Sequence, residues 1–92
     1  MTIKELMSID ISIWEMTIEY FGNKRNSKYG YVFEDDSLEG LFDNNLQSYT
    51  FENVRDNDVL DEIINVFGDL EIRKIIPRDD ELTIYCSTKE VR

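Results

Sequence analysis

The sequence predicts an α+β fold, an antiparallel sheet of four to five strands with at least one packed helix. Apolar residues alternate with polar ones in paired segments, which we interpret as β-hairpins over residues 13–34 and 70–87. The apolar residues of 58–67 recur instead at helical spacing, which predicts the helix. The 92 residues contain no internal repeat and no linker, so we expect one globular domain over residues 1–92.

A short helix is expected at the start of the chain. Thr2 and Glu5 have the spacing of a capping box, in which each side chain accepts a hydrogen bond from the backbone N–H of the other residue. This arrangement favours a turn or two of helix directly after Thr2.

The alternation of apolar residues changes parity near Ile13. Ile9 and Ile13 share one parity, and the run that begins with Trp14 takes the other. We therefore expect a bulge, or the start of a strand, at this point. Trp14 is interpreted as an anchor of the core, and the alternative is an exposed aromatic residue at an interface.

The first hairpin is predicted to pair strands 13–21 and 28–34 across the polar connection 22–27. The tip carries three basic residues, Lys24, Arg25 and Lys28. Such a tip can clasp phosphate or RNA, or it can be a solvated turn. We favour the turn, because three charges neutralise little phosphate on a chain whose net charge is −10.

Residues 35–47 leave two interpretations open, a short helix or a loop. Ser37 is a suitable N-cap, but Gly40 disfavours a helix. A third strand is expected over residues 48–54, where the alternation returns.

The helix at 58–67 has both of its end signals. Asp58 is the expected N-cap, and Gly68 stands where helices commonly stop. The apolar stripe that would face the sheet consists of Val59, Leu60, Ile63, Ile64 and Phe67.

The second hairpin is predicted from strands at 70–76 and 82–86, with turn residues at 77–81 between them. Cys86 shares the parity of the apolar positions on its strand, so we interpret it as a small core residue rather than a reactive thiol. A single cysteine forms no internal disulfide, and the N-terminus lacks the apolar segment of a signal peptide. No apolar run is long enough for a membrane span, so we expect a cytoplasmic protein.

The residue types present argue against an enzyme. The sequence has no histidine, which removes the commonest proton-transfer group at neutral pH and the usual partner of a catalytic Ser or Cys. The acidic residues near 56–62 faintly resemble a calcium loop, but Asp61 stands where that loop needs glycine and Phe67 where it needs glutamate. We therefore expect no catalytic residue, no metal site and no cofactor.

The negative charge is concentrated in one stretch. Residues 34–69 contain 11 acidic residues and one base, Arg55, whereas the two flanking arms together are neutral. Such a surface repels nucleic acid and anionic lipid, so we expect no direct binding to nucleic acid or membrane. It either keeps the protein soluble or binds a basic partner. The candidate partner-binding residues are Glu34, Asp35, Asp36, Glu39, Asp43, Glu52, Asp56, Asp58, Asp61 and Glu62.

In size, acidity and lack of histidine, the chain resembles the small DNA-mimic inhibitors of phages and mobile elements, which include anti-CRISPR and anti-restriction proteins. The resemblance implies a protein that acts in a bacterial host cell. We expect a monomer or homodimer. The resemblance also implies as partner a basic nucleic-acid-binding protein, first of all a CRISPR effector nuclease. The same features also fit an immunity protein that neutralises a nuclease toxin. A third interpretation is an interaction module whose acidic face is merely solvated.

Overall fold

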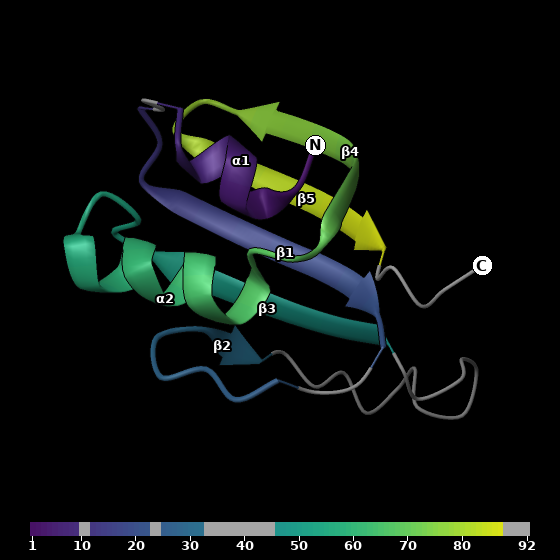
Figure 1. The fold of residues 1–92 in the computed structure, drawn as a ribbon. Helices are drawn as coiled ribbons and strands as arrows, with labels where there is room; N and C mark the ends of the chain where they lie inside the picture. The colour runs from purple at the N-terminus through teal and green to yellow at the C-terminus, as the bar shows by residue number, and fades with distance from the viewer. Residues whose placement is uncertain (10–11, 23–24, 33–45, 88–92) are drawn as a thin grey trace.

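The computed structural model describes residues 1–9, 12–22, 25–32 and 46–87, in which two helices lie on one face of a five-stranded sheet (Figure 1). This arrangement confirms the α+β fold class. The elements are α1 (Ile3–Met7), β1 (Glu15–Phe21), β2 (Tyr31–Val32), β3 (Leu46–Glu52), α2 (Asn57–Phe67), β4 (Glu71–Arg78) and β5 (Glu81–Ser87).

The sheet is mixed rather than antiparallel throughout, which corrects the sequence-based expectation. Its strand order is β2-β3-β1-β5-β4, and β1 and β5 at its centre run parallel. The other neighbouring pairs are antiparallel. The parallel pair follows from the topology, because α2 and β4 bring the chain back to the end of the sheet where β1 begins.

The predicted hairpin over 70–87 is confirmed, with β4 and β5 antiparallel from Glu71 opposite Ser87 to Arg78 opposite Glu81. Asp79 in its tight turn has a φ of 49°, a left-handed conformation that aspartate tolerates.

The predicted hairpin over 13–34 is wrong, because β3 lies between β1 and β2. Thr50 of β3 stands opposite Thr17 of β1 on one side and opposite Tyr31 of β2 on the other. A seven-residue β3 pairs along the whole of β1, whereas the described part of β2 has two residues. The long polar connection after β1 lacks the tight turn that would fix a hairpin register. β1 therefore pairs with β3, which offers the longer run of paired residues.

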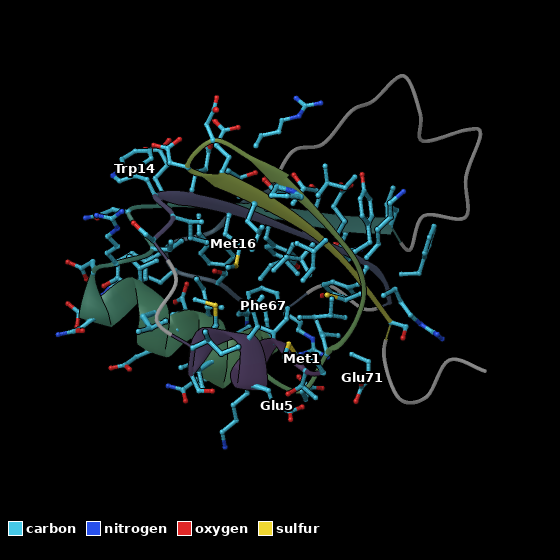
Figure 2. The ribbon with its side chains drawn as sticks, turned by 90° about the horizontal axis from the view of Figure 1, so that it is seen from above. Met1, Glu5, Trp14, Met16, Phe67 and Glu71 are labelled. Carbon is cyan, nitrogen blue, oxygen red and sulfur yellow. The ribbon has the colours of Figure 1, made fainter. Side chains whose placement is uncertain are left out.

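The core lies between the sheet and the two helices. Phe67 of α2 occupies its centre, with ring centroids 4.8 Å from Tyr49, 5.5 Å from Phe51 and 6.4 Å from Tyr20. Figure 2 shows Phe67 and Met16 between the sheet and the helices, and both are fully buried. Cys86 is buried as predicted, and burial raises the pKa of its thiol to about 12.

The helix predicted at 58–67 is confirmed, with two corrections. Its N-cap is Asp56 rather than Asp58, because an Asp56 carboxylate oxygen accepts hydrogen bonds from the N–H groups of Asp58 (2.9 Å) and Val59 (3.4 Å). Its buried stripe is Val59, Ile63 and Phe67, spaced four residues apart, whereas Leu60 and Ile64 are half-buried. Val59, Ile63 and Phe67 therefore carry the contact with the sheet.

The ends of the helices are joined to one another. Gly68 ends α2 as predicted, and a Cβ on it would contact the Ile64 carbonyl and lie 3.2 Å from Lys4 Cβ. The expected capping box opens α1, with Thr2 N–H donating to Glu5 Oε1 (2.9 Å) and Glu5 N–H donating to Thr2 Oγ1 (3.2 Å). Lys4 N–H then donates to the Gly68 carbonyl at 3.1 Å, which fixes α1 against the end of α2.

Two further sequence-based expectations concern membranes and the segment 35–47. None of the described helices is long and apolar enough to cross a membrane. The choice between helix and loop concerned residues 35–47. Residues 35–45 lie outside the described part of the chain, and residues 46 and 47 belong to β3.

Candidate functional site: the acidic end of the sheet

Carboxylates gather at one end of the molecule, where β1 begins, β3 ends, α2 begins and β4 turns into β5 (Figure 1). We name this group the acidic end. It consists of Glu15, Glu52, Asp79, Asp80 and Glu81. Asp56 and Asp58 at the start of α2 belong to the helix layer and are not part of it.

Backbone hydrogen bonds hold the segments of the acidic end together. The N–H groups of Trp14 and Glu15 donate to the Asp80 carbonyl at 2.7 and 3.3 Å. Val54 N–H donates to the Trp14 carbonyl at 3.0 Å. The carboxylates are therefore carried on three segments whose relative positions are fixed.

Three glutamates form a row across the sheet. Glu15 in β1 stands opposite Glu52 in β3 and opposite Glu81 in β5. Neighbouring strands lie about 4.8 Å apart, so the row places one carboxylate roughly every 5 Å. Like charges in cross-strand positions repel, and the sheet tolerates this repulsion here.

The row perturbs the ionisation of its central member. A hydrogen bond with the Glu81 side chain, partial burial and the negative charges of Glu81, Glu52 and Asp80 together raise the pKa of Glu15 above its ordinary value. Glu15 therefore holds its proton more tightly than an isolated glutamate does.

Basic side chains at this end do not neutralise it. Arg55 donates to Ser12 Oγ at 2.6 Å, and Arg78 stands opposite Glu81 on β4. Within the described ranges, ion pairs join the Met1 amino group to Glu71 and Arg25 to Asp69. Both of these ion pairs lie toward the opposite end of the strands, as the positions of Met1, Glu71 and Trp14 in Figure 2 illustrate.

Trp14 is exposed at the acidic end, so its expected role as a core anchor is wrong. Its exposed fraction is 43%, and Ile13 is buried instead. The backbone of Trp14 serves as the junction between the 53–56 turn and the β4–β5 turn, which places the residue at the margin of the sheet. The expected strand start is confirmed, since β1 begins at Glu15.

The ten residues predicted from sequence fall into four groups. Glu52 belongs to the acidic end, whereas Asp56, Asp58 and Asp61 are exposed at the start of α2, with Asp56 as its N-cap. Glu62 binds another part of the chain. The remaining five, Glu34, Asp35, Asp36, Glu39 and Asp43, lie outside the described residues.

Glu62 holds the segment that leads into β2. Its carboxylate accepts hydrogen bonds from Ser27 Oγ (2.6 Å), Lys28 N–H (2.8 Å) and Tyr29 N–H (2.8 Å). Burial alone raises the pKa of Glu62, but these hydrogen bonds and the charge of Lys28 outweigh it, so the pKa lies below the ordinary value. We therefore assign Glu62 a positioning role.

The basic tip predicted at 24–28 is only in part the solvated turn that we expected, because Lys28 is exposed whereas Arg25 binds the body of the molecule. The Arg25 guanidinium donates to the Val66 carbonyl at 2.6 Å, pairs with Asp69 and lies 5.4 Å from the centroid of the Tyr20 ring. Arg25 thus fastens the 25–30 segment to the end of α2. Lys24 lies outside the described residues.

Sequence reasoning missed four members of the acidic end, Glu15, Asp79, Asp80 and Glu81, because they belong to arms that are neutral as a whole. The signal was the position of these residues at predicted strand ends and in a predicted turn. Neighbouring strands bring such positions to the same edge of a sheet. This grouping can be inferred only when the pairing of the strands is known.

The described residues contain no group of three or more His, Cys, Asp or Glu side chains arranged to hold a metal ion. No protein-family model matches the chain, and no curated protein or solved structure matches it. The acidic end is therefore interpreted from its own geometry and charge.

Proposed function

We propose that the protein is a non-enzymatic inhibitor that presents its acidic end to the basic nucleic-acid-binding site of another protein. The observation that carries this proposal is the row formed by Glu52, Glu15 and Glu81, three acidic residues in register on adjacent strands. Fixed carboxylates at regular spacing offer arginine and lysine side chains the kind of partner that a phosphate backbone offers.

The mechanism is competition for a basic surface. The net charge of −10 steers the chain toward a positively charged groove, and the association slows as salt screens the field. Guanidinium and ammonium groups that would neutralise phosphates pair instead with carboxylates of the acidic end. A bound inhibitor then excludes nucleic acid both by its volume and by its charge.

The exposed Trp14 supports a binding surface rather than a merely solvated one. Tryptophan and arginine are enriched among the residues that dominate the energy of interfaces. An arginine that approaches the carboxylates can also stack on the Trp14 ring, because the ring faces of tryptophan attract cations.

The resemblance to anti-CRISPR proteins makes a guide-loaded CRISPR effector nuclease the first partner to test. The experiment measures the displacement of a fluorescently labelled target duplex from purified effectors, by anisotropy, at 50 to 300 mM salt. We expect the protein to displace the duplex at low salt and to lose potency steeply as salt rises. A panel of purified nuclease toxins tests the immunity-protein alternative in the same assay. Bound DNA that stays in place on every effector and every toxin at the lowest salt would refute the proposal.

A further inference from the structure

The sheet face opposite α1 and α2 carries exposed apolar side chains next to the glutamate row. Side chains alternate between the two faces of a strand, and on β1 the buried ones are Met16, Ile18 and Tyr20. The intervening positions and their register partners form the other face, which we name the open face. On the three central strands, β1, β3 and β5, the residues of the open face are Glu15, Thr17, Glu19, Phe21, Leu46, Ser48, Thr50, Glu52, Glu81, Thr83 and Tyr85.

Along β1, the open face changes from acidic where the strand begins to apolar where it ends. The glutamate row lies at the end where β1 begins, and the next row consists of threonines, of which Thr17 and Thr50 are hydrogen bonded at 3.1 Å. Tyr85 is 38% exposed on β5. At the far end Phe21 and Leu46 stand opposite each other and are 55% and 43% exposed.

We infer that the open face is the surface that docks on the partner, and that the partner presents an arginine-rich protein surface to it. This inference rests on the proposed function and deepens it by assigning the contact to one side of the sheet. The helix layer then faces away from the partner.

Charge complementarity favours an arginine-rich protein surface as the partner of the open face. The central strands of the open face carry Glu15, Glu19, Glu52 and Glu81 and no basic residue, while Arg78 and Lys74 stand at its β4 edge, opposite Glu81 and Tyr85. A cationic side chain placed over Glu15 relieves the mutual repulsion of the row, whereas a neutral or acidic partner leaves that repulsion in place. The raised pKa of Glu15 is consistent with glutamates on both of its neighbouring strands.

The neighbouring side chains favour arginine over lysine as the contacting group. Guanidinium groups bind carboxylates through two parallel hydrogen bonds and stack on aromatic rings. Tyr85 offers such a ring beside Glu19, its register partner on β1. Phe21 and Leu46 add exposed apolar area at the far end, which an exclusively solvated acidic face would not require.

The helix layer offers a matched control. Asp58 and Asp61 are exposed carboxylates on α2, and Glu52 and Glu81 are exposed carboxylates on the strands. The double variants Glu52→Gln/Glu81→Gln and Asp58→Asn/Asp61→Asn remove the same charge from opposite sides of the sheet. A difference between them therefore reports on the face and not on net charge.

The test is an NMR titration of the full-length ¹⁵N-labelled protein with the probe peptide nona-arginine. We expect amide shifts to concentrate in β1, β3 and β5, and we expect Glu52→Gln/Glu81→Gln to weaken binding about fivefold while Asp58→Asn/Asp61→Asn changes it less than about twofold. Shifts centred on α2, equal losses in the two variants, or no shifts at millimolar peptide and low salt would overturn the inference.

The displacement assay separates this inference from the proposed function. If the wild-type protein displaces DNA and Glu52→Gln/Glu81→Gln is equally potent, the partner does not dock on the open face. The protein is then still an inhibitor, but it binds through another surface. If the peptide maps to the open face while DNA stays bound on every effector and toxin, the inhibitor function is wrong and the docking face stands.

Discussion

Glu15 and Glu81 stand opposite each other on the parallel strands β1 and β5. A side-chain hydrogen bond with Glu81, partial burial and the negative charge of Glu81 raise the pKa of Glu15 above its ordinary value. Like-charged side chains at such close quarters weaken a sheet, and a cationic group of a partner relieves their repulsion. This relationship is the physical basis of the proposed function.

We predict that Glu15→Gln stabilises the protein at pH 7 by about 0.5 kcal/mol, because it removes the central charge of the row. A raised folded-state pKa means that the protonated form stabilises the fold below the ordinary value of 4.5 and that this contribution is lost as the pH rises through the raised pKa. The gain from Glu15→Gln should therefore shrink toward zero as the pH falls below 4.5, measured by urea unfolding between pH 4 and 7.

Glu19→Gln is the control for this prediction, since it removes the same charge from the same face of β1, opposite Ser48 and Tyr85. It should change stability less. An equal gain from both variants would mean that the net charge, and not the row, sets the repulsion.

Glu62→Ala should destabilise the protein by about 2 kcal/mol, because it removes three hydrogen bonds that hold the segment entering β2. The lowered pKa of Glu62 means that its contribution is present above 4.5 and is lost as the pH falls through the lowered pKa. Asp61→Ala is the adjacent exposed control and should stay within about 0.5 kcal/mol of wild type. Amide exchange at Lys28 and Tyr29 should accelerate only in Glu62→Ala, and unchanged protection there would contradict the assignment.

Ile63→Asp should cost about 4 kcal/mol, because it buries an unpaired charge where α2 meets the sheet. Asn65→Asp adds the same charge on the exposed side of the same helix and should be nearly neutral. Chemical denaturation of both variants measures the contrast, and a mild effect of Ile63→Asp would show that α2 does not pack as described.

Fluorescence quenching of Trp14 tests its exposure among carboxylates. Trp14 is the only tryptophan of the chain, so the emission has a single source. We expect efficient quenching by acrylamide, and stronger quenching by Cs⁺ than by I⁻, because the negative field of the acidic end attracts cations and repels anions. High salt should reduce this difference. A tryptophan that all three quenchers fail to reach would be a core residue after all.

The sequence predicted elements more successfully than their arrangement. The β4–β5 hairpin and α2 could be predicted, because the turn residues at 79–80 and the spacing of Ile63 and Phe67 are local signals. The position of β3 between β1 and β2 could not, because the pairing of distant strands leaves no local signal in the chain.

The acidic surface shows the same division between local and distant information. Counting charge along the chain identified Glu52, whereas Glu15 and Glu81 became part of the site only through register. The count also included Glu62, whose carboxylate is used by the 27–29 segment. Trp14 was misjudged because its parity matches that of the core, although the strand begins one residue after it.

The most direct test of the central claim is inhibition of DNA cleavage by a guide-loaded CRISPR effector nuclease, measured against salt for wild type, Glu52→Gln/Glu81→Gln and Asp58→Asn/Asp61→Asn. Our account predicts salt-sensitive inhibition by the wild type and a potency about fivefold lower for Glu52→Gln/Glu81→Gln, with a shallower salt dependence. Asp58→Asn/Asp61→Asn should retain nearly full potency. Inhibition that does not depend on salt, or that is unchanged when Glu52 and Glu81 lose their charge, would contradict the claim that the acidic end binds the partner.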